Sequence, residues 1–546
     1  MKSTINNFIF LFCACMIFIA CGTKKGNIVF DANNGGLFLP DGFGAIVVVD
    51  SIGPSRHLAV KENGDIYVKL KITSDAPGSV ALRDENGDGK ADIIQPFGKY
   101  VNDGIFATGM RIHNGYLYYS TEKVVYRQKI DNDLVPTSKQ EIVLMDESDQ
   151  WHIAKPIAFD KEGNMYVPYS APSNACASFI NTTGSSVQQA GQYPCPELLS
   201  HAGIWKFKAN AINQTQKDGV QMGTGLRSIV AMNFNTSNNT LYAVQHGRDD
   251  LHLLWPNHYS AWQNAVTPAE EFFEIKEGNH YGWPYAYYDP ISKQKMQAPE
   301  YGGDGKKLAT DHSYISPLVD FPAHWAPNDL LFYQGDQFPA RYKNGAFIAF
   351  HGSTNRGPYP QAGYIVAFVP FKNGKPSGTW EVFADGFAGV DTIVNVSDAK
   401  FRPMGLAEGP DGSLYISDSR KGKIWRILYK EDKTKFSDAS LAKMEQRKNT
   451  ATNIKTPDPV KDIIQIKYSK AGQTIYQNNC TNCHQANLKG DGNRYPSLIK
   501  SNYLNDKSSF RNLIYNGKGN MPGFKQLSSK EIDELETYIQ SVISKQ

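Results

Sequence analysis

Between about residues 40 and 430 the chain repeats one pattern: an apolar run, a turn rich in Gly or Asn, and a second apolar run ending in Tyr and small or polar residues. Short runs of this kind predict β-hairpins rather than long helices. Six hairpins are visible, and they begin at His57, Met110, Ile157, Ala231, Gly345 and Met404. Because one hairpin cannot bury its own faces, the repeat predicts a mainly β fold, a six-bladed β-propeller.

The spacing of apolar residues becomes helical near the end of the chain. In the segment SSKEIDELETYIQSVI a Ser cap and an acidic first turn precede four apolar positions that share one helix face. These positions are Ile532, Leu535, Ile539 and Val542. We therefore expect a small all-α domain over residues 466–546.

A polar, Lys-rich stretch, residues 431–465, separates the two predicted domains. It predicts a flexible linker, and about 35 flexible residues would have an r.m.s. span of roughly 30 Å. Such a linker would let the small domain visit the end of the propeller at high effective concentration.

The N-terminus combines Lys2 with an apolar run from Phe8 to Ala20, which predicts a signal segment over residues 1–20. The tetrapeptide FIAC resembles a bacterial lipobox, in which Cys21 would carry the lipid and residues 21–39 would form a tether. A plain signal peptide with an incidental cysteine is the alternative. The prediction is an exported lipoprotein, periplasmic or at the cell surface, that meets the membrane through its lipid alone.

Composition limits the classes of partner. The 546 residues carry a net charge of only +3 and no long Lys/Arg run, which argues against a nucleic-acid surface. A hydrophobic fraction of 41% is that of globular domains.

Two cysteines, Cys176 and Cys195, lie close together in the predicted propeller. In an oxidising compartment such a pair is expected to close a loop as a disulfide. Two free thiols are the alternative.

The segment NNCTNCHQ contains a CxxCH motif, with Cys480, Cys483 and His484. In this motif two thiols bind the haem vinyl groups and the adjacent imidazole binds the iron. A zinc site would need a second ligand pair, and a redox dithiol would not need the histidine. Met521, in the loop NGKGNMPGF, is the candidate sixth ligand, with an ordinary core methionine as the alternative. The last 80 or so residues resemble small mono-haem cytochromes c.

The loop RDENGDGKAD spaces carboxylate and amide oxygens like the start of an EF-hand. Its candidate calcium ligands are Asp84, Asn86, Asp88 and Asp92. Gln95 stands where the closing Glu would be expected, so a polar hairpin turn without metal is the alternative.

Several segments together resemble the soluble glucose/sorbosone dehydrogenases that use pyrroloquinoline quinone (PQQ). They are RHLAVKENGDIYV, GLRSIVAMNF, QHGRDDL, EEFFEIKEGNHYGWPY, FHGSTNRGP and FRPMGLAEGPDGSLYISD. The resemblance covers nearly all of residues 40–430. It implies a propeller with PQQ at one end of its axis, beside calcium, and a histidine base for the sugar hydroxyl.

The resemblance implies roles for particular residues. His152 occupies the position of the general base, for which a neutral imidazole is suited. Arg227 and Arg402 match cofactor-facing arginines, whose charged forks suit the carboxylates of PQQ. The backbone carbonyls of Gly247 and Arg248 are candidate calcium ligands.

Arg356 and Asp418 match the cofactor region by weaker transfers, and two positions depart from the family's pattern. Ser228 stands where relatives have Asn, and Trp151 stands where many have Asp. An insertion, HLLWPNHYSAWQNAVTP, is expected to reshape the substrate mouth.

Two functions follow from these features. The first is a PQQ-dependent dehydrogenase that oxidises an aldose or related sugar and passes electrons to its own haem c and on to a respiratory acceptor. The second is a non-catalytic propeller that binds a carbohydrate or protein and carries an electron-transfer cytochrome. Calcium, PQQ and haem c are the expected cofactors of the first.

Overall fold

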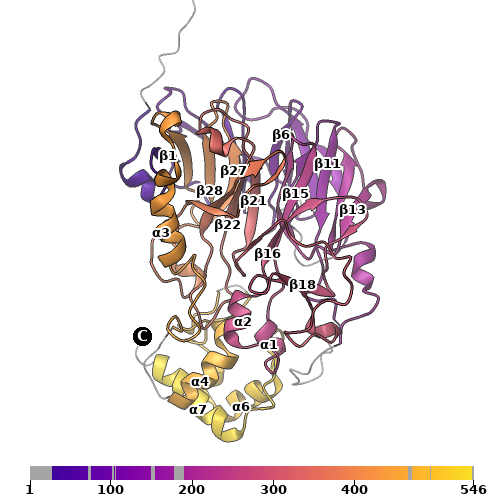
Figure 1. Ribbon diagram of the computed structural model, residues 1–546, viewed down its shortest axis with the longest axis vertical. Coiled ribbons are helices and arrows are strands. Elements are labelled where there is room, and N and C mark those ends of the chain that lie inside the picture. Colours follow the sequence, from indigo (N-terminus) through magenta and orange to yellow (C-terminus); the bar gives the residue numbers. More distant parts are fainter. Residues whose placement is uncertain are drawn as a thin grey trace, which may run out of the picture.

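The structure is a computed structural model that describes residues 28–71, 76–100, 104, 106–148, 154–177, 190–464, 470–491 and 494–543. It confirms the predicted architecture: a six-bladed β-propeller followed by a small helical domain (Figure 1). Each blade is an antiparallel sheet of four principal strands, and neighbouring blades bury apolar side chains between them.

The first three blades follow the chain in order. Blade one comprises β2 (Ser55–Val60), β3 (Ile66–Leu70), β4 (Ser79–Arg83) and β5 (Ile93–Phe97). Blade two comprises β6 (Met110–His113), β7 (Tyr116–Ser120), β8 (Val124–Lys129) and β9 (Glu141–Met145). Blade three comprises β10 (Ala158–Phe159), β11 (Asn164–Tyr169), β12 (Gly203–Lys208), β13 (Val220–Thr224) and the parallel strand β17 (Asn279–His280).

The other three blades complete the ring. Blade four comprises β14 (Ile229–Asn235), β15 (Thr240–Gln245), β16 (Glu270–Ile275) and β20 (Val319–Phe321). Blade five comprises β21 (Pro327–Phe332), β22 (Ala346–Phe350), β23 (Ile365–Val369) and β26 (Glu381–Ala384). Blade six comprises β27 (Pro403–Glu408), β28 (Leu414–Asp418), β29 (Ile424–Tyr429) and β1 (Phe43–Val49).

The first strand of the chain closes the ring. Strand β1 pairs antiparallel with β29, so that Phe43 lies opposite Tyr429 and the N-terminal strand is the outer strand of the last blade. The Phe43 ring packs edge-on against Tyr342 and Phe383 of blade five, with centroid separations of 5.4 and 5.2 Å. Closure by distant parts of the chain leaves only short, protected sheet edges.

Short elements decorate the loops. Two hairpins are formed by β18 (Ala286–Asp289) with β19 (Gln294–Gln297), and by β24 (Phe371–Lys372) with β25 (Lys375–Pro376). The 3₁₀ helices are η1 (Ala32–Gly36), η2 (Pro196–Leu199), η3 (Gln216–Asp218), η4 (Pro299–Tyr301), η5 (Ala340–Tyr342), η6 (Val396–Asp398), η7 (Lys433–Lys435), η8 (Asp438–Leu441) and η9 (Asn502–Asn505). Helices α1 (Leu251–Leu254) and α2 (Ala261–Val266) lie in the insertion between β15 and β16.

The segment predicted to be a flexible linker, 431–465, packs along the propeller as far as it is described. Helix α3 (Ala442–Thr450) lies on blade five, where Met444 and Ile454 are buried in its core. Lys448 adds a cation–π contact with Trp380, its Nζ lying 4.0 Å from the ring centroid. Composition alone predicted a flexible linker. In the structure these few apolar residues face one blade and pack the segment against it.

The described part of the predicted N-terminal tether, from Ile28 to Leu39, is also packed. Leu37 and Leu39 are buried, and the backbone of Phe38 exchanges two hydrogen bonds with that of Asp385. Among the described helices, none is long and apolar enough to cross a membrane.

In its described residues the C-terminal domain has four α-helices: α4 (Lys470–Asn479), α5 (Thr481–His484), α6 (Lys507–Asn516) and α7 (Ser529–Ile543). The four apolar positions predicted on α7 are all buried, and Ser528 and Glu531 form the cap at its start. Helices α4 and α7 approach so closely that a Cβ at Gly472 would lie 2.0 Å from the carbonyl oxygen of Glu534. The domain lies below the end of the propeller that carries α1 and α2 (Figure 1).

Candidate functional site

A cluster of cationic side chains lies on the propeller axis. Arg402 directly precedes β27, the inner strand of blade six, and its Nε donates to the carbonyl of His351 over 2.9 Å. Arg56 comes from the inner strand of blade one and Lys71 follows the second strand of that blade. We call Arg56, Lys71 and Arg402 the axial cluster.

Burial and mutual repulsion act on the axial cluster together. Burial and the charge of Arg402 lower the pKa of Arg56 to about 10. Burial and the charges of Arg56 and Arg402 lower the pKa of Lys71. An anionic partner would stabilise cations that are buried and repel one another. The cluster therefore fits a group that carries several carboxylates.

Arg227 lies beside the loop that follows β15. Its Nη1 donates to the carbonyl of Gly247 over 2.7 Å, and its Nη2 donates to Oδ2 of Asp249 over 2.9 Å. Burial alone would raise the pKa of Asp249, but the charges of Arg227 and His324 outweigh it and hold that pKa below its ordinary value. The ion pair between Arg227 and Asp249 therefore holds this loop against the propeller.

Three histidines lie between these groups: His57 is buried, and His246 and His351 are half-buried. Burial lowers the pKa of His57 and of His246 to about 4, and burial with the charge of Arg402 holds the pKa of His351 well below its ordinary value. His246 donates through Nε2 to the carbonyl of Pro327 over 2.8 Å. All three rings are therefore neutral at neutral pH and serve as hydrogen-bonding groups rather than charges.

Two predicted cofactor residues are engaged elsewhere. The guanidinium of Arg248 forms an ion pair with Glu300, and both side chains are 3% exposed. The carboxylate of Asp418 accepts backbone N–H groups of Arg402, Arg420 and Lys421, which holds the turn after β28. Asp418 therefore positions the backbone of Arg402 and Arg248 anchors its own loop.

The predicted EF-hand-like loop is closed by its own hydrogen bonds. Asp84 accepts from the backbone N–H groups of Gly87 and Gly89, and Asp92 accepts from the backbone N–H of Asn86. Asp88 accepts from that of Lys90. Within the described ranges no group of three or more His, Cys, Asp or Glu is arranged to hold a metal ion. These hydrogen bonds are those of a polar turn, and calcium at this loop stays a prediction.

Some predictions lie at the edge of what is described. His152, Trp151 and Cys21 lie outside the described residues. Cys176 and Cys195 are joined as a disulfide, the pairing predicted from the sequence.

The CxxCH segment is arranged to ligate a metal through His484. The Nδ1 atom of His484 donates to the carbonyl of Pro496 over 2.9 Å, which leaves Nε2 with the lone pair that iron requires. Cys480 and Cys483 are both free thiols, and Cys480 packs in the core of the helical domain. Met521 packs against the same core. The residues present therefore fit a haem held by two thioether bonds and one imidazole.

The haem motif faces the propeller directly. Asn482, between the two cysteines, donates through Nδ2 to Oδ1 of Asp250 over 2.9 Å, in a buried contact. Gln485, directly after the histidine, donates to the carbonyl of Thr354 over 3.1 Å. A Cβ at Gly357 would lie 2.6 Å from the carbonyl oxygen of Thr481, so the two backbones are in close contact.

The insertion after β15 supports this docking. His252 in α1 donates through Nε2 to the carbonyl of Asn478 over 2.9 Å, and Leu253 packs against the helical core. Trp262 in α2 donates to the carbonyl of Pro457 over 2.8 Å. The insertion was expected to shape a substrate mouth, and in the structure it holds the helical domain and the segment leading to it.

The loop after β15, which carries Asp249 and Asp250 and which we call the docking loop, also joins Arg227 to the haem motif. Asp249 binds Arg227, while the next residue, Asp250, binds Asn482. Burial and the neighbouring charge of Asp249 raise the pKa of Asp250. Two adjacent residues thus connect the arginine side of the propeller to the haem motif.

Sequence reasoning missed several members of this arrangement, including Arg56, Lys71, Asp249 and Asp250. Glu270 is another: burial raises its pKa to about 7, although it accepts the backbone N–H groups of Ala326 and Gly247. Asp249 and Asp250 stand in the segment QHGRDDL that carried the family resemblance, so that segment held a signal for them.

A six-bladed propeller with cationic groups on its axis, joined to a helical domain with a CxxCH motif, defines the class as a propeller–cytochrome fusion. The chain belongs to the TrAA12-like family, whose match covers residues 37–430. Residues 469–539 match a second family, described as cytochrome C oxidase, cbb3-type, subunit III.

Individual relatives are distant in sequence. A pyrroloquinoline quinone-dependent sugar dehydrogenase of Hypocrea jecorina is 23% identical over 441 residues, which is 75% of this chain and 86% of that protein. An uncharacterized protein of Borreliella burgdorferi is 28% identical over 224 residues, 40% of this chain. That alignment spans 52%, about half, of the length of the Borreliella protein.

Solved structures share the propeller fold. The calcium structure of Trichoderma reesei Carbohydrate-Active Enzymes Family AA12 is 18% identical with a TM-score of 0.57, covering 74% of this chain and 99% of that one. The holo form of the pyranose dehydrogenase PQQ domain from Coprinopsis cinerea is 16% identical with a TM-score of 0.55, covering 72% and 97%.

Proposed function

We propose that this protein is a quinoprotein that oxidises an aldose or related sugar with PQQ and delivers the electrons to its own haem c. The observation that carries the proposal is the docking of the CxxCH segment on the loop that holds Arg227. Through Asp249 and Asp250 that loop contacts Arg227 on one side and Asn482 on the other. The family membership of residues 37–430 supports the same reaction class.

The axial cluster and Arg227 are the residues that would hold PQQ. When bound, PQQ supplies the two-electron acceptor for the sugar. Arg402 is held by two backbone carbonyls, those of His351 and Gly352, while the carboxylate of Asp418 accepts from its backbone N–H. A carboxylate of the cofactor would pair with the guanidinium of Arg402.

His152 is proposed as the base that takes the sugar hydroxyl proton, on the family resemblance. The neutral histidines of the axis are suited to orient polar groups rather than to carry the proton away, because burial keeps His57 and His246 from charging.

Calcium takes no step in this proposal. The carbonyl of Gly247 already accepts from Arg227, and Glu270 accepts from the Gly247 N–H. Among the described residues no group of three or more His, Cys, Asp or Glu is arranged to hold a metal ion, so calcium at the carbonyls of Gly247 and Arg248 stays a prediction.

The close contact of Gly357 with Thr481 supports electron transfer in the docked arrangement. Cys480 and Cys483 would hold the haem through thioether bonds, and Asn482 between them contacts the propeller at Asp250. Electrons would then pass one at a time from the haem to a respiratory acceptor. Export and attachment to a membrane through a lipid on Cys21 complete the proposal.

The test is reduction of the haem by sugar. Protein matured with haem is loaded with PQQ, aldoses are added, and haem absorbance is followed at equal protein concentration. We expect sugar-dependent reduction that requires PQQ and is abolished by His152→Ala with haem content unchanged. If no sugar in a broad panel reduces the haem of PQQ-loaded protein, the propeller is a binding module and the dehydrogenase proposal is wrong.

A further inference from the structure

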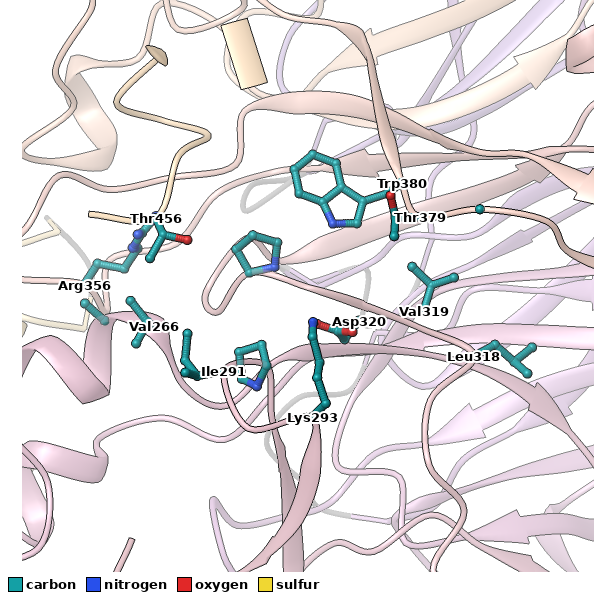
Figure 2. A pocket seen from close by; sticks show the side chains of 14 residues that line it. Val266, Ile291, Lys293, Leu318, Val319, Asp320, Arg356, Thr379, Trp380 and Thr456 are labelled. Carbon is teal, nitrogen blue, oxygen red and sulfur yellow. The ribbon is translucent and has the colours of Figure 1, made fainter. Parts of the chain in front are cut away.

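A cavity of about 270 Å³ lies away from the axial cluster, on the flank of the propeller. It is bounded by α2, the turn between β18 and β19, β20, and the segments before β26 and after α3. Its polar lining is Lys293, Asp320, Arg356, Thr379 and Thr456. Figure 2 shows Arg356 and Thr456 together at one end, with Lys293 and Asp320 on another wall and the Trp380 indole above.

Arg356 is the residue whose burial and unpaired nitrogen atoms indicate that this cavity binds a ligand. The residue is 2% exposed, and its Nε and Nη1 atoms have no hydrogen-bond partner among the described residues. Burial lowers its pKa to about 10, and no carboxylate is among the groups that influence it. A buried guanidinium without an anion is costly, so the cavity is complementary to a small anion.

The other lining residues indicate what kind of molecule carries the anionic group. Lys293 and Asp320 form an ion pair of 2.7 Å at the wall, offering both donors and acceptors. Thr379 and Thr456 add hydroxyl groups, while Trp380, Pro322 and Val266 provide apolar surface. Hydroxyl-rich molecules with one carboxylate match this combination, and a volume of about 270 Å³ admits a single sugar unit rather than an oligosaccharide.

We propose that this cavity binds a sugar acid, with its carboxylate on Arg356 and its hydroxyl groups toward Lys293 and Asp320. The choice of sugar acid rests on the proposed function, because the lactone formed when an aldose loses two electrons and two protons opens with water to such an acid. The site would sense the product of the reaction at a distance from the axial cluster.

The experiment measures binding without turnover. Full-length protein with haem but without PQQ is titrated calorimetrically with gluconate, with glucose and with inorganic phosphate. We expect gluconate to bind and glucose to bind far more weakly, since glucose lacks the carboxylate. Arg356→Gln should weaken gluconate binding by roughly tenfold to a hundredfold, the range for a lost charge-assisted hydrogen bond.

Matched variants separate the site from general effects. Lys375→Gln removes an exposed cation of β25 outside the cavity and should leave gluconate affinity unchanged. Should Arg356→Gln fail to fold, Thr456→Val, at an exposed position of the lining, should still weaken gluconate.

Three results would overturn the proposal: no gluconate binding to folded protein, phosphate binding without gluconate binding, or unchanged gluconate affinity with an altered haem potential in Arg356→Gln. The last would mean that Arg356 neutralises a carboxylate of the haem. Because PQQ is left out, failure here leaves the dehydrogenase proposal intact, and failure of sugar-driven haem reduction leaves this binding test intact.

Discussion

The haem motif and the axial cluster are assembled in opposite ways. Cys480, Cys483 and His484 come from one short stretch, and the local turn after α4 already brings them to one place. Arg56 and Arg402 come from blades one and six, and only the closed ring brings them together. The first site depends on local sequence, whereas the second depends on the integrity of the whole propeller.

The largest expected effect comes from breaking the local site. Replacing both Cys480 and Cys483 by Ser should remove essentially all covalently bound haem, because no thioether bond can then form. Haem absorbance retained after denaturation measures this. Since the helical domain has its own core, the main thermal transition of the propeller should persist, and its loss would contradict the separation of the two units.

The next largest effect is expected from a change in the axial cluster, whose residues come from different blades. Arg402→Gln should lower PQQ affinity by roughly tenfold to a hundredfold, because a charged partner of the proposed carboxylates is lost. Equilibrium titration with PQQ measures the affinity. Lys372→Gln, at an exposed position of β24, is the control and should bind PQQ as the natural sequence does. Equal affinity in Arg402→Gln and in the control would remove the axial cluster from the cofactor site.

The contact between the two sites can be weakened by itself. His252→Ala removes the hydrogen bond to the carbonyl of Asn478, a loss of about 1 kcal/mol or roughly fivefold in the docking equilibrium constant. The rate of sugar-driven haem reduction, followed by stopped flow, should fall by up to that factor with haem content and PQQ affinity unchanged.

His312→Ala, at an exposed position, is the matched control for that variant. An unchanged rate in His252→Ala would mean that the docked arrangement does not limit electron transfer.

The last prediction concerns the pH dependence of stability and Glu270, which accepts from the backbone N–H of Gly247. Burial raises the pKa of Glu270 from 4.5 to about 7, so the folded protein holds this proton more tightly than the unfolded chain does. The stability that the group contributes is therefore fully present below pH 4.5 and is lost as the pH rises through 7, by at most about 1.4 kcal/mol per pH unit.

In Glu270→Gln this pH dependence should disappear. Thermal midpoints measured between pH 4.5 and 8 provide the comparison, with Glu431→Gln, at an exposed position, as the control. If Glu270→Gln and the natural sequence lose stability in parallel over this range, Glu270 does not hold the proton.

Much of the arrangement could be read from the sequence, because the signals were local. Hairpin patterning predicted six blades, and helical spacing predicted the buried face of α7 with Ile532 and Leu535. The CxxCH spacing predicted the haem motif, and the family resemblance pointed to Arg227 and Arg402. A sequence match does not reveal that the carboxylate of Asp418 accepts backbone N–H groups or that the guanidinium of Arg248 pairs with Glu300, so the roles expected of these two residues stay predictions.

What the sequence determined by itself is therefore the set of elements and the haem motif, since periodicity and short spacings are properties of neighbouring residues. Only the tertiary structure decided that residues 431–464 pack on blade five, that the haem motif rests on Asp250, and that Arg356 borders a separate cavity. Each of these depends on contacts between residues far apart in the chain, and a buried charge such as Arg356 becomes informative only when the surroundings that do or do not neutralise it are known.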